Sequence, residues 1–310
     1  MMTGRQFYVA LAVLAASLLA GCRDRDDSAA IAGEPQAPQP EESQPTPEDE
    51  GAITPGGDHP WEQPGTQAGE EIIGPAGISL VWVPGGSFMM GSTDEDVEWA
   101  VRELQGDRRW LDSEQPAHEV ELSGFWIGKT EVTVAQWRSA MGSVPDEYND
   151  QGDDHPAVNV SWDDCKDFCE KTGLELPTEA QWEYAARGPD SRHYPWGDDW
   201  DDDRLCWGGN QGPGGRTFPV GSFPSGASWC GALDMGGNVW EWCGDWYDGD
   251  YYASSPSRDP AGPSSGRSRV MRGGSWYNGA YNCRAAYRLY HIVPSYRASY
   301  VGFRASRSCR

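Results

Sequence analysis

The chain has 310 residues, of which 38% are hydrophobic, and it contains 16 Trp, 39 Gly and 23 Pro. This composition predicts a loop-rich fold with a core of aromatic side chains and glycine turns, and the length allows one large domain or two small ones. The formal net charge of −24 argues against nucleic acid as a partner, because binding to phosphates requires a basic surface.

The N-terminus has the features of a lipoprotein export signal. An apolar segment over residues 7–20 follows Arg5; it is too short to span a membrane but suits the core of a signal peptide. It ends in Leu19-Ala20-Gly21-Cys22, which matches the lipobox of bacterial lipoproteins, whose cysteine receives a diacylglycerol. We therefore predict a signal peptide over residues 1–21 and lipidation of Cys22. The alternative is an ordinary secretory signal with a coincidental cysteine.

Residues 22–76 are expected to form a disordered acidic tether. They are rich in Pro, Glu, Gln, Asp and Gly, with few apolar residues and no periodic pattern. Such a segment cannot bury enough apolar surface to offset its chain entropy, and its prolines and like charges favour extended conformations. Arg23 follows the lipobox cysteine, where Asp would indicate retention in the inner membrane. We therefore expect the protein to be anchored in the outer membrane of the bacterial cell envelope.

Ordered structure is predicted over residues 77–310, with a few helices in a loop-dominated β scaffold. Residues 81–91 indicate a strand, a glycine turn and a second strand, and residues 120–127 fit a half-buried strand with a kink at Gly124. A helix is expected over residues 134–141, a second after Ser161, and a third from a capping box at Thr178 to near Gly188. Helical periodicity is scarce beyond Gly188, so the predicted fold class is α+β.

Short aromatic and glycine-rich motifs lie along this whole domain. In chain order they are Trp82–Gly86 with Met90-Gly91, Glu131–Thr133, Val160–Trp162, Leu176–Gly188, Tyr194–Gly197, Leu233–Trp242, Arg272–Trp276 and Gly302–Arg304. Taken in this order, they resemble the formylglycine-generating enzyme, or sulfatase-modifying factor, family over residues 77–307. The resemblance implies a C-type-lectin-like fold, with a twisted, mostly antiparallel sheet core, two main helices and long packed loops.

The stretch from Asp234 to Glu241 is a candidate metal site. Two carboxylates bracket a glycine-rich segment, so side-chain and backbone oxygens can converge on a hard cation. The resemblance implies calcium binding by Asp234, Gly237, Val239 and Glu241, the middle two through backbone carbonyls. In the alternative interpretation the two carboxylates only cap turns. A second calcium site of the family does not match residues 205–209, and the acidic run over residues 198–203 is interpreted as a solvated loop.

The enzymatic members of the family use two cysteines, five residues apart, to hold a copper(I) ion. Counted from Gly273, these positions are Asn278 and Cys283; counted back from residues 284–288, the second falls at Ala280. Neither count gives a cysteine pair, and one thiolate cannot form the two-coordinate copper centre. Cys283 is therefore a weak catalytic candidate. The iron-dependent branch of this fold uses a histidine set that is not matched here, because the five histidines are scattered: His59, His118, His155, His193 and His291.

Seven cysteines follow Cys22, and in an exported chain they are expected to be largely oxidised. The resemblance implies a bond between Cys169 and a cysteine near the C-terminus, which here is Cys309. The other two bonds are guesses from proximity along the chain, and Cys165 is left over. The guessed pairs are Cys206–Cys230 and Cys243–Cys283.

Two functions remain open at this point. The first is a non-catalytic binding or scaffold module, which the missing cysteine pair favours, with an exported protein or a glycan as its ligand and with the membrane contacted through Cys22. The second is an oxidase that makes formylglycine, or a maturation factor for exported proteins. Residues 277–300 are rich in Tyr and Arg, as recognition surfaces often are. Aromatic packing at a sheet edge explains the tyrosines equally well. The members of this set are Tyr281, Tyr287, Tyr290, Tyr296, His291, Arg284, Arg288 and Arg297.

Overall fold

The computed structural model describes residues 59–145 and 149–309, so the expected signal peptide, Cys22 and most of the tether lie outside the described residues. Residues Pro55–Arg310 form one compact unit. Its ordered elements begin before residue 77, where the tether was expected to end. Strand β1 (Glu71–Ile73) pairs with β2 (Ser79–Val83), and the Trp126 indole donates to the Gln63 carbonyl at 2.9 Å. Residues 59–76 form a short, mainly polar segment. Its place in the fold therefore depends on residues farther along the chain, such as Trp126.

Three sheets make up the β scaffold of the described residues. An antiparallel sheet has the order β1-β2-β5-β10, in which β10 (Ser306–Ser308) brings the C-terminal end against β5 (Phe125–Gly128). A second sheet has the order β8-β7-β6-β9, and here β9 runs parallel to β6. Its strands are β6 (Trp240–Trp246), β7 (Arg269–Arg272), β8 (Leu289–Ile292) and β9 (Val301–Gly302). Strands β3 (Gly86–Met90) and β4 (His118–Leu122) form a two-stranded sheet.

The described residues contain five α-helices and several short 3-10 helices. The α-helices are α1 (Asp94–Leu104), α2 (Arg108–Leu111), α3 (Val134–Met141), α4 (Trp162–Thr172) and α5 (Glu179–Arg187). The 3-10 helices are η1 (Pro60–Glu62), η2 (Pro75–Gly77), η3 (Asp112–Glu114), η5 (Pro224–Gly226), η6 (Tyr251–Ser254) and η7 (Ala280–Cys283). Helices α1, α3, α4 and α5 each begin with a capping box, which satisfies two of the free N–H groups at a helix start.

Several of the predicted elements are confirmed. Helix α3 has the expected bounds, α4 begins after its N-cap Ser161, and α5 runs from its N-cap Thr178 to Gly188. The strand expected over residues 120–127 is instead two strands, β4 and β5, which belong to different sheets. The break falls at Gly124, where a Cβ would lie 2.5 Å from the Trp82 ring, so only glycine lets the chain turn there.

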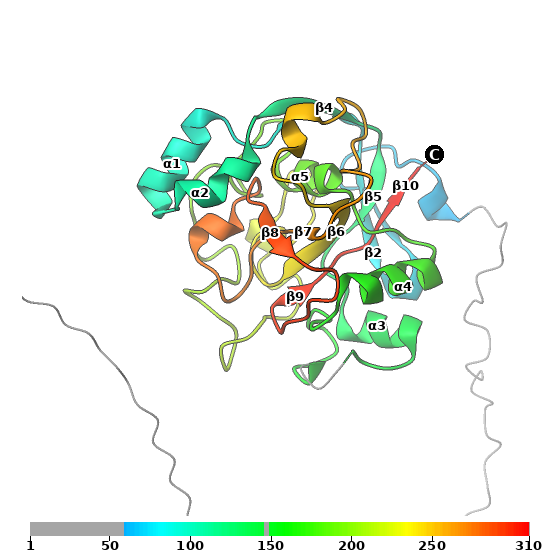
Figure 1. The fold of residues 1–310 in the computed structure, drawn as a ribbon. Coiled ribbons are helices and arrows are strands. Elements are labelled where there is room, and N and C mark those ends of the chain that lie inside the picture. Colours follow the sequence, from blue (N-terminus) through cyan, green and yellow to red (C-terminus); the bar gives the residue numbers. More distant parts are fainter. Residues whose placement is uncertain (1–58, 146–148, 310) are drawn as a thin grey trace, which may run out of the picture. The chain divides into compact units, whose positions relative to one another are not determined.

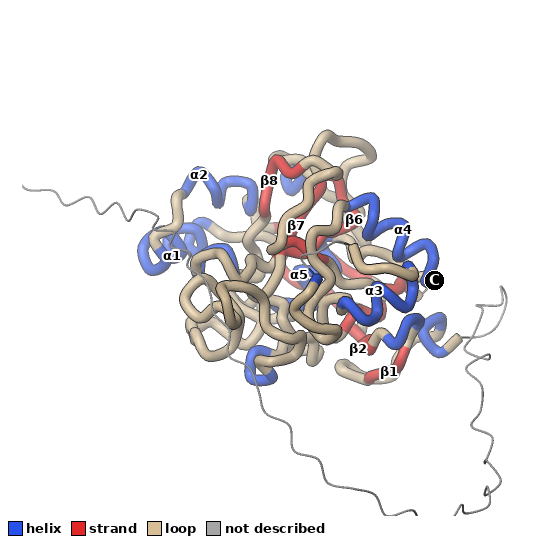
Figure 2. Tube along the Cα trace, turned by 90° about the horizontal axis from the view of Figure 1, so that it is seen from below, coloured by secondary structure: helices blue, strands red, loops and turns tan. Residues whose placement is uncertain are grey.

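Helices α1 and α2 were not expected. Among the residues of α1 only Val97 and Ala100 are buried, although with Leu104 they recur at the three- and four-residue spacing of a helix face. Figure 1 shows α1 and α2 on one side of the domain, while β10 and the start of the described chain lie on the other. Figure 2 shows that loops form much of the structure between them. Among residues 59–145 and 149–309, no helix is both long and apolar enough to cross a membrane.

Candidate functional site

The loop after β7 contains Asn278 and Cys283. Counted from Gly273, these are the two positions at which a copper(I)-binding cysteine pair is expected. Gly273 and Gly274 open this loop with φ angles of 96° and 77°, a left-handed conformation that favours glycine. A Cβ at Gly274 would lie 2.8 Å from the Cys283 Sγ, so the glycine lets the thiol pack directly on the backbone. Helix η7 closes the loop and ends at Cys283.

Asn278 is held by hydrogen bonds on three sides. Its side-chain Oδ1 accepts from the Trp240 indole at 2.8 Å and from the Ser275 hydroxyl at 2.5 Å. Its backbone carbonyl accepts from the Gly208 N–H at 2.9 Å. The amide side chain is therefore an integral part of this loop. Because an amide oxygen is a hard donor, Asn278 does not supply a ligand that suits copper(I).

Cys283 is a buried thiol. Its side chain is fully enclosed, and its Sγ lies 3.7 Å from the Gly279 carbonyl. Burial, and to a smaller extent the electrostatic interaction with Cys206, raises the pKa of Cys283 well above the ordinary value for a thiol. The thiolate is the form that attacks substrates and binds metals. Cys283 therefore stays protonated and unreactive at neutral pH.

The structure contains the seven cysteines of the described residues as free thiols. The expected bonds are not formed in it: Cys169–Cys309, Cys206–Cys230 and Cys243–Cys283. Cys206 Sγ lies 3.9 Å from the Arg216 carbonyl, whereas Cys230 Sγ lies 3.5 Å from the Ala185 carbonyl. The two thiols of this guessed pair thus face different parts of the backbone. Nearness along the chain does not decide which cysteines meet when long loops separate them.

Glu241, one of the expected calcium ligands, is bonded to an arginine. Arg304 donates to both carboxylate oxygens of Glu241 at 2.6 Å, and the Trp182 indole donates to Oε2 at 2.7 Å. All three side chains are fully buried. A bidentate contact of this kind is among the strongest that a carboxylate makes. Glu241 can therefore bind a cation only on the lone pairs that Arg304 and Trp182 leave.

A second and a third carboxylate lie beside this pair. Asp234 accepts from the Gly221 N–H at 2.6 Å, and the charges of Asp234 and Glu241 both act on Glu131. Glu131 is buried, and neither of its carboxylate oxygens has a hydrogen-bond donor. Burial, reinforced by the neighbouring carboxylates, raises the pKa of Glu131 well above its usual range, and burial also raises the pKa of Asp234.

This cluster of Glu131, Asp234 and Glu241 has the chemistry of a cation site. Three buried carboxylates face one arginine, so a bound cation would neutralise charge that burial otherwise makes unfavourable. The oxygens of Glu131, Asp234 and Glu241 do not all lie within 4.8 Å of one another in this structure, so they would have to move together to share one ion. Within the described residues, three carboxylates meet that distance only at Asp201, Asp202 and Asp203, on a loop where two of the three are exposed. Such loops are ordinary solvated surface.

Glu131 lies in one of the family motifs, but its sequence position alone does not predict a place in this cluster. The available signal was its place between strand β5 and Thr133, the N-cap of α3, where a charged residue interrupts an apolar neighbourhood. The carbonyls of Gly237 and Val239 lie on the same segment as Asp234 and Glu241, and the glycine has a φ angle of 84°. Calcium binding by these four residues stays a prediction.

Two of the three arginines expected on a recognition surface are not there, whereas Arg297 is exposed. Arg284 and Arg288 are buried, and they pair with Glu114 and Glu179 at 2.5 and 2.6 Å. Arg297 pairs with Asp164 on α4. Two of these guanidinium groups therefore belong to the core, because a buried carboxylate and a buried arginine neutralise each other. Arg284 and Arg288 lie in a stretch that the sequence suggests is a surface loop. Their acidic partners, Glu114 and Glu179, are more than 100 residues away and could not be identified from the sequence.

Aromatic side chains of the same region do reach the surface. Tyr277 is 66% exposed, and its ring is stacked on Tyr300 with centroids 6.1 Å apart. Trp110 on α2 is 37% exposed, and it is stacked on Tyr281 at 5.7 Å. Trp276 and Trp207 lie beside Tyr277 and are partly exposed. We call these six residues the aromatic face: Trp110, Trp207, Trp276, Tyr277, Tyr281 and Tyr300.

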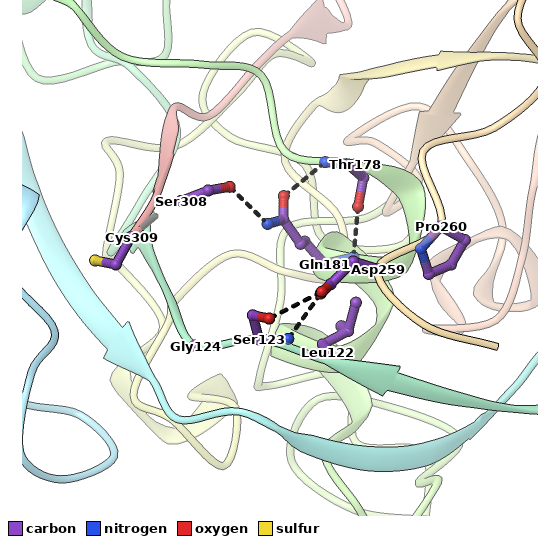
Figure 3. A pocket seen from close by; sticks show the side chains of 9 residues that line it. All are labelled: Leu122, Ser123, Gly124, Thr178, Gln181, Asp259, Pro260, Ser308 and Cys309. Atoms are coloured by element: carbon purple, nitrogen blue, oxygen red, sulfur yellow. Dashed lines mark hydrogen bonds between the residues drawn. The ribbon is translucent and has the colours of Figure 1, made fainter. Parts of the chain in front are cut away.

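A separate pocket lies at the start of α5, close to the C-terminal end of the chain. It has a volume of about 340 Å³ and is lined by Leu122, Ser123, Gly124, Thr178, Gln181, Asp259, Pro260, Ser308 and Cys309. Figure 3 shows that its polar groups bond to one another: Gln181 donates to Ser308 at 3.1 Å, and Asp259 accepts from the Ser123 hydroxyl at 2.8 Å. This pocket contains none of the residues around Asn278 or Glu131.

Comparisons with known proteins agree on one family. Residues 75–309 match the model of the sulfatase-modifying factor enzyme 1-like domain. The chain is 38% identical to a formylglycine-generating enzyme of Streptomyces coelicolor over 206 residues, which are 59% of this chain and 60% of the relative. It is 32% identical to the formylglycine-generating enzyme of Thermomonospora curvata over 292 residues, covering 73% of this chain and 92% of the relative.

A solved structure gives the same result for the fold. PvdO from Pseudomonas aeruginosa superimposes with a TM-score of 0.64 at 26% identity, over 78% of this chain and 99% of that protein. The likeness confirms the predicted α+β, C-type-lectin-like fold.

Proposed function

The chain belongs to the sulfatase-modifying factor enzyme 1-like family, and from this premise we propose that it is a non-catalytic binding module of the family. The observation that carries the proposal is Asn278. An amide, fixed by Trp240 and Ser275, stands where the first thiol of a copper(I) pair was sought. The remaining thiol of that pair, Cys283, is buried and has a raised pKa. The aromatic face beside this loop is the surface that supports binding.

We expect the domain loaded with copper(I) to leave a sulfatase-type peptide, Cys-X-Pro-X-Arg, unmodified under oxygen. Asn278 and Cys283 together supply at most one soft ligand, and that thiol is protonated at neutral pH. Mass spectrometry reports conversion as the loss of the peptide thiol and the gain of an aldehyde. The formylglycine-generating enzyme of Thermomonospora curvata, assayed in parallel, is the positive control.

The alternative function, a formylglycine-generating oxidase or a maturation factor for exported proteins, makes the opposite prediction. Turnover of the peptide that disappears in a Cys283→Ala variant would establish the oxidase and overturn the binding module. Copper(I) would then be the cofactor. Turnover that survives Cys283→Ala would also overturn the binding module, and would place the chemistry at another residue.

We further propose that the carboxylate cluster binds calcium. Glu131 supports this, because its two buried oxygens have no donor, and calcium prefers a shell of about six to eight oxygen ligands. Asp234, Glu241 and the carbonyls of Gly237 and Val239 would complete the shell together with Glu131. The ion would compensate the buried negative charge and fix the loop that leads from Asp234 into β6.

Calcium is expected to raise the melting temperature of the domain. A ligand that binds only the folded state stabilises it by about 2.7 kcal/mol at 100 times its Kd. The Glu131→Gln variant should lose most of this increase, whereas Asp202→Asn, in the exposed acidic loop, should keep it. Elemental analysis of purified protein gives the stoichiometry. If chelation leaves the melting temperature unchanged, the calcium site is excluded.

The export signal supports a lipid anchor for the module. We propose that Cys22 is acylated and holds the protein in the bacterial cell envelope, at the outer membrane. A Cys22→Ser variant should lose incorporated radiolabelled fatty acid and move from the membrane fraction to the soluble fraction. Unlabelled, soluble wild-type protein would contradict this anchor, and the other proposals would be unaffected.

A further inference from the structure

The aromatic face presents flat ring surfaces to solvent. Tyr277 lies on Tyr300 with an angle of 16° between the ring planes, and Trp110 lies on Tyr281 with an angle of 21°. In each pair the inner ring supports the outer one, and the outer ring is exposed. Two stacked rings hold each other in a fixed orientation, so little conformational entropy is lost when a ligand contacts the outer ring.

Trp276, Tyr277 and Tyr281 lie on one loop, and hydrogen bonds join this loop to the segments that carry Trp207 and Tyr300. The Gly208 N–H donates to the Asn278 carbonyl, which places Trp207 next to Tyr277. The Trp276 indole donates to the Ser299 carbonyl at 3.2 Å, which ties this loop to the one with Tyr300. Tyr281 is on η7, which contacts α1. Helix α1 in turn contacts α2, the helix that carries Trp110. Three distant parts of the sequence therefore meet at this face.

The face combines stacking surfaces with hydrogen-bonding groups. Asn278 lies among the rings and is partly exposed, and the two bonds to its Oδ1 leave its amide N–H groups for a ligand. The tyrosine hydroxyls add donors and acceptors at the ring edges. A matching ligand therefore needs a C–H-rich face for the rings and hydroxyl groups around its edge. A pyranose sugar has both, since its axial C–H bonds carry the positive charge that the negative face of an aromatic ring attracts.

The negative charge of the protein limits which sugars can bind at the aromatic face. The chain carries a formal net charge of −24, and the exposed acidic loop of Asp201, Asp202 and Asp203 follows Trp200, whose ring packs edge-on against Trp207 at 4.9 Å. An anionic polysaccharide would be repelled by this field. A small cation would be held best by rings that face a common point, but these rings lie flat on one another. A neutral glycan fits both observations.

The position of the face is compatible with a large ligand. In Figure 1, α2 lies on the opposite side of the domain from η1, where the described chain begins beside β10, and Figure 2 agrees. The described chain therefore begins on the side of the domain away from α2, the helix that carries Trp110. From these observations we infer that the aromatic face is a binding site for a neutral oligosaccharide. This inference rests on the proposed function, because it names the ligand class of the binding module.

The inference is tested with the whole exported chain and three probes: a neutral hexasaccharide series (cellohexaose and chitohexaose), polygalacturonate, and decaproline. Quenching of tryptophan fluorescence and isothermal titration report binding. We expect at least one neutral hexasaccharide to bind, and the anionic polymer and the peptide not to bind. Tyr277→Ala and Trp110→Ala should each weaken binding by about tenfold or more, as the loss of an aromatic contact at the centre of a binding site does.

Two further variants separate stacking from folding. Tyr277→Phe keeps the ring and should keep most of the affinity, whereas Trp61→Ala removes a partly buried ring, stacked on His59, at the opposite side of the domain and should change nothing in binding. Melting temperatures confirm that each variant is folded. Binding of neither hexasaccharide, binding of decaproline or polygalacturonate in preference to them, or full affinity in Tyr277→Ala would overturn the inference. Conversion of the sulfatase-type peptide would instead overturn the proposed function, so the two failures are distinguishable.

Discussion

Replacing Arg304 with methionine is expected to destabilise the folded domain by about 3–5 kcal/mol, the usual effect of leaving one member of a buried ion pair without its partner. Arg304 donates to both oxygens of Glu241 and also to the carbonyls of Gly128 and Leu233 at 2.9 and 3.0 Å. Methionine fills a similar volume but donates nothing. Glu241 would then be buried beside Asp234 and Glu131 with no cation to compensate three carboxylates.

Urea unfolding of wild type and variant, each in chelator and in calcium, measures this effect. Arg138→Met is the matched control: Arg138 pairs with Asp153, but the two side chains are 46% and 66% exposed, so solvent screens the pair and the stability should stay nearly unchanged. If Arg304→Met does not fold, Trp182→Phe removes one donor to Glu241 and should cost about 1–2 kcal/mol. A loss below about 1 kcal/mol in Arg304→Met would show that the carboxylates are neutral in the fold. Calcium should offset part of the loss.

Local sequence signals predicted the helices and strands that begin and end with strong chemical markers. Ser161 and Thr178 mark helix starts because their side chains accept from the backbone N–H three residues on, and this pattern needs no information from the rest of the chain. Helix α1 was missed although Thr93 has the same capping box, because its residues are mostly charged. What fixes α1 is contact with α2 and η7, which a local pattern does not contain.

The candidate site was predicted only in part for a similar reason. Asp234 and Glu241 are near each other in sequence, and the glycines between them suggested a turn. Glu131 and Arg304 join the cluster from positions 63 or more residues away from Glu241, so no spacing rule reveals them. The tyrosines and arginines of residues 277–300 are interleaved in the sequence, so they suggested one surface. The structure divides them, since Tyr277 is exposed and Arg288 is buried in an ion pair.

Asp245 is expected to make the stability of this domain fall as the pH rises from 5 to 8. Asp245 is buried, and its Oδ2 accepts from the backbone N–H of Glu179 at 2.8 Å. Burial, followed by the charge of Glu179, raises the pKa of Asp245 from 3.8 to about 7 in spite of Arg288 and Arg269 nearby. The folded state therefore binds a proton on Asp245 over a pH range in which the unfolded state has released it.

The sign follows from this difference in proton binding. With the folded pKa above the unfolded one, the contribution of Asp245 is fully present below pH 4 and is lost as the pH rises through 7. Between pH 5 and pH 8 the loss is on the order of 2–3 kcal/mol, at 1.36 kcal/mol per pKa unit. Asp245→Asn keeps an oxygen for the Glu179 N–H but does not titrate. The stability of the variant relative to wild type should therefore rise by this amount over the same range.

Urea unfolding at pH 5, 6, 7 and 8 measures the relative stability, and the comparison removes the pH dependence that Glu131 and Asp234 contribute to both proteins. Asp153→Asn is the control, because Asp153 is exposed and the hydrogen bond from Arg138 lowers its pKa, so its titration ends below pH 5. A difference between Asp245→Asn and wild type that stays constant from pH 5 to pH 8 would mean that Asp245 is ionised throughout. In that case Arg269 and Arg288, rather than burial, would govern its charge.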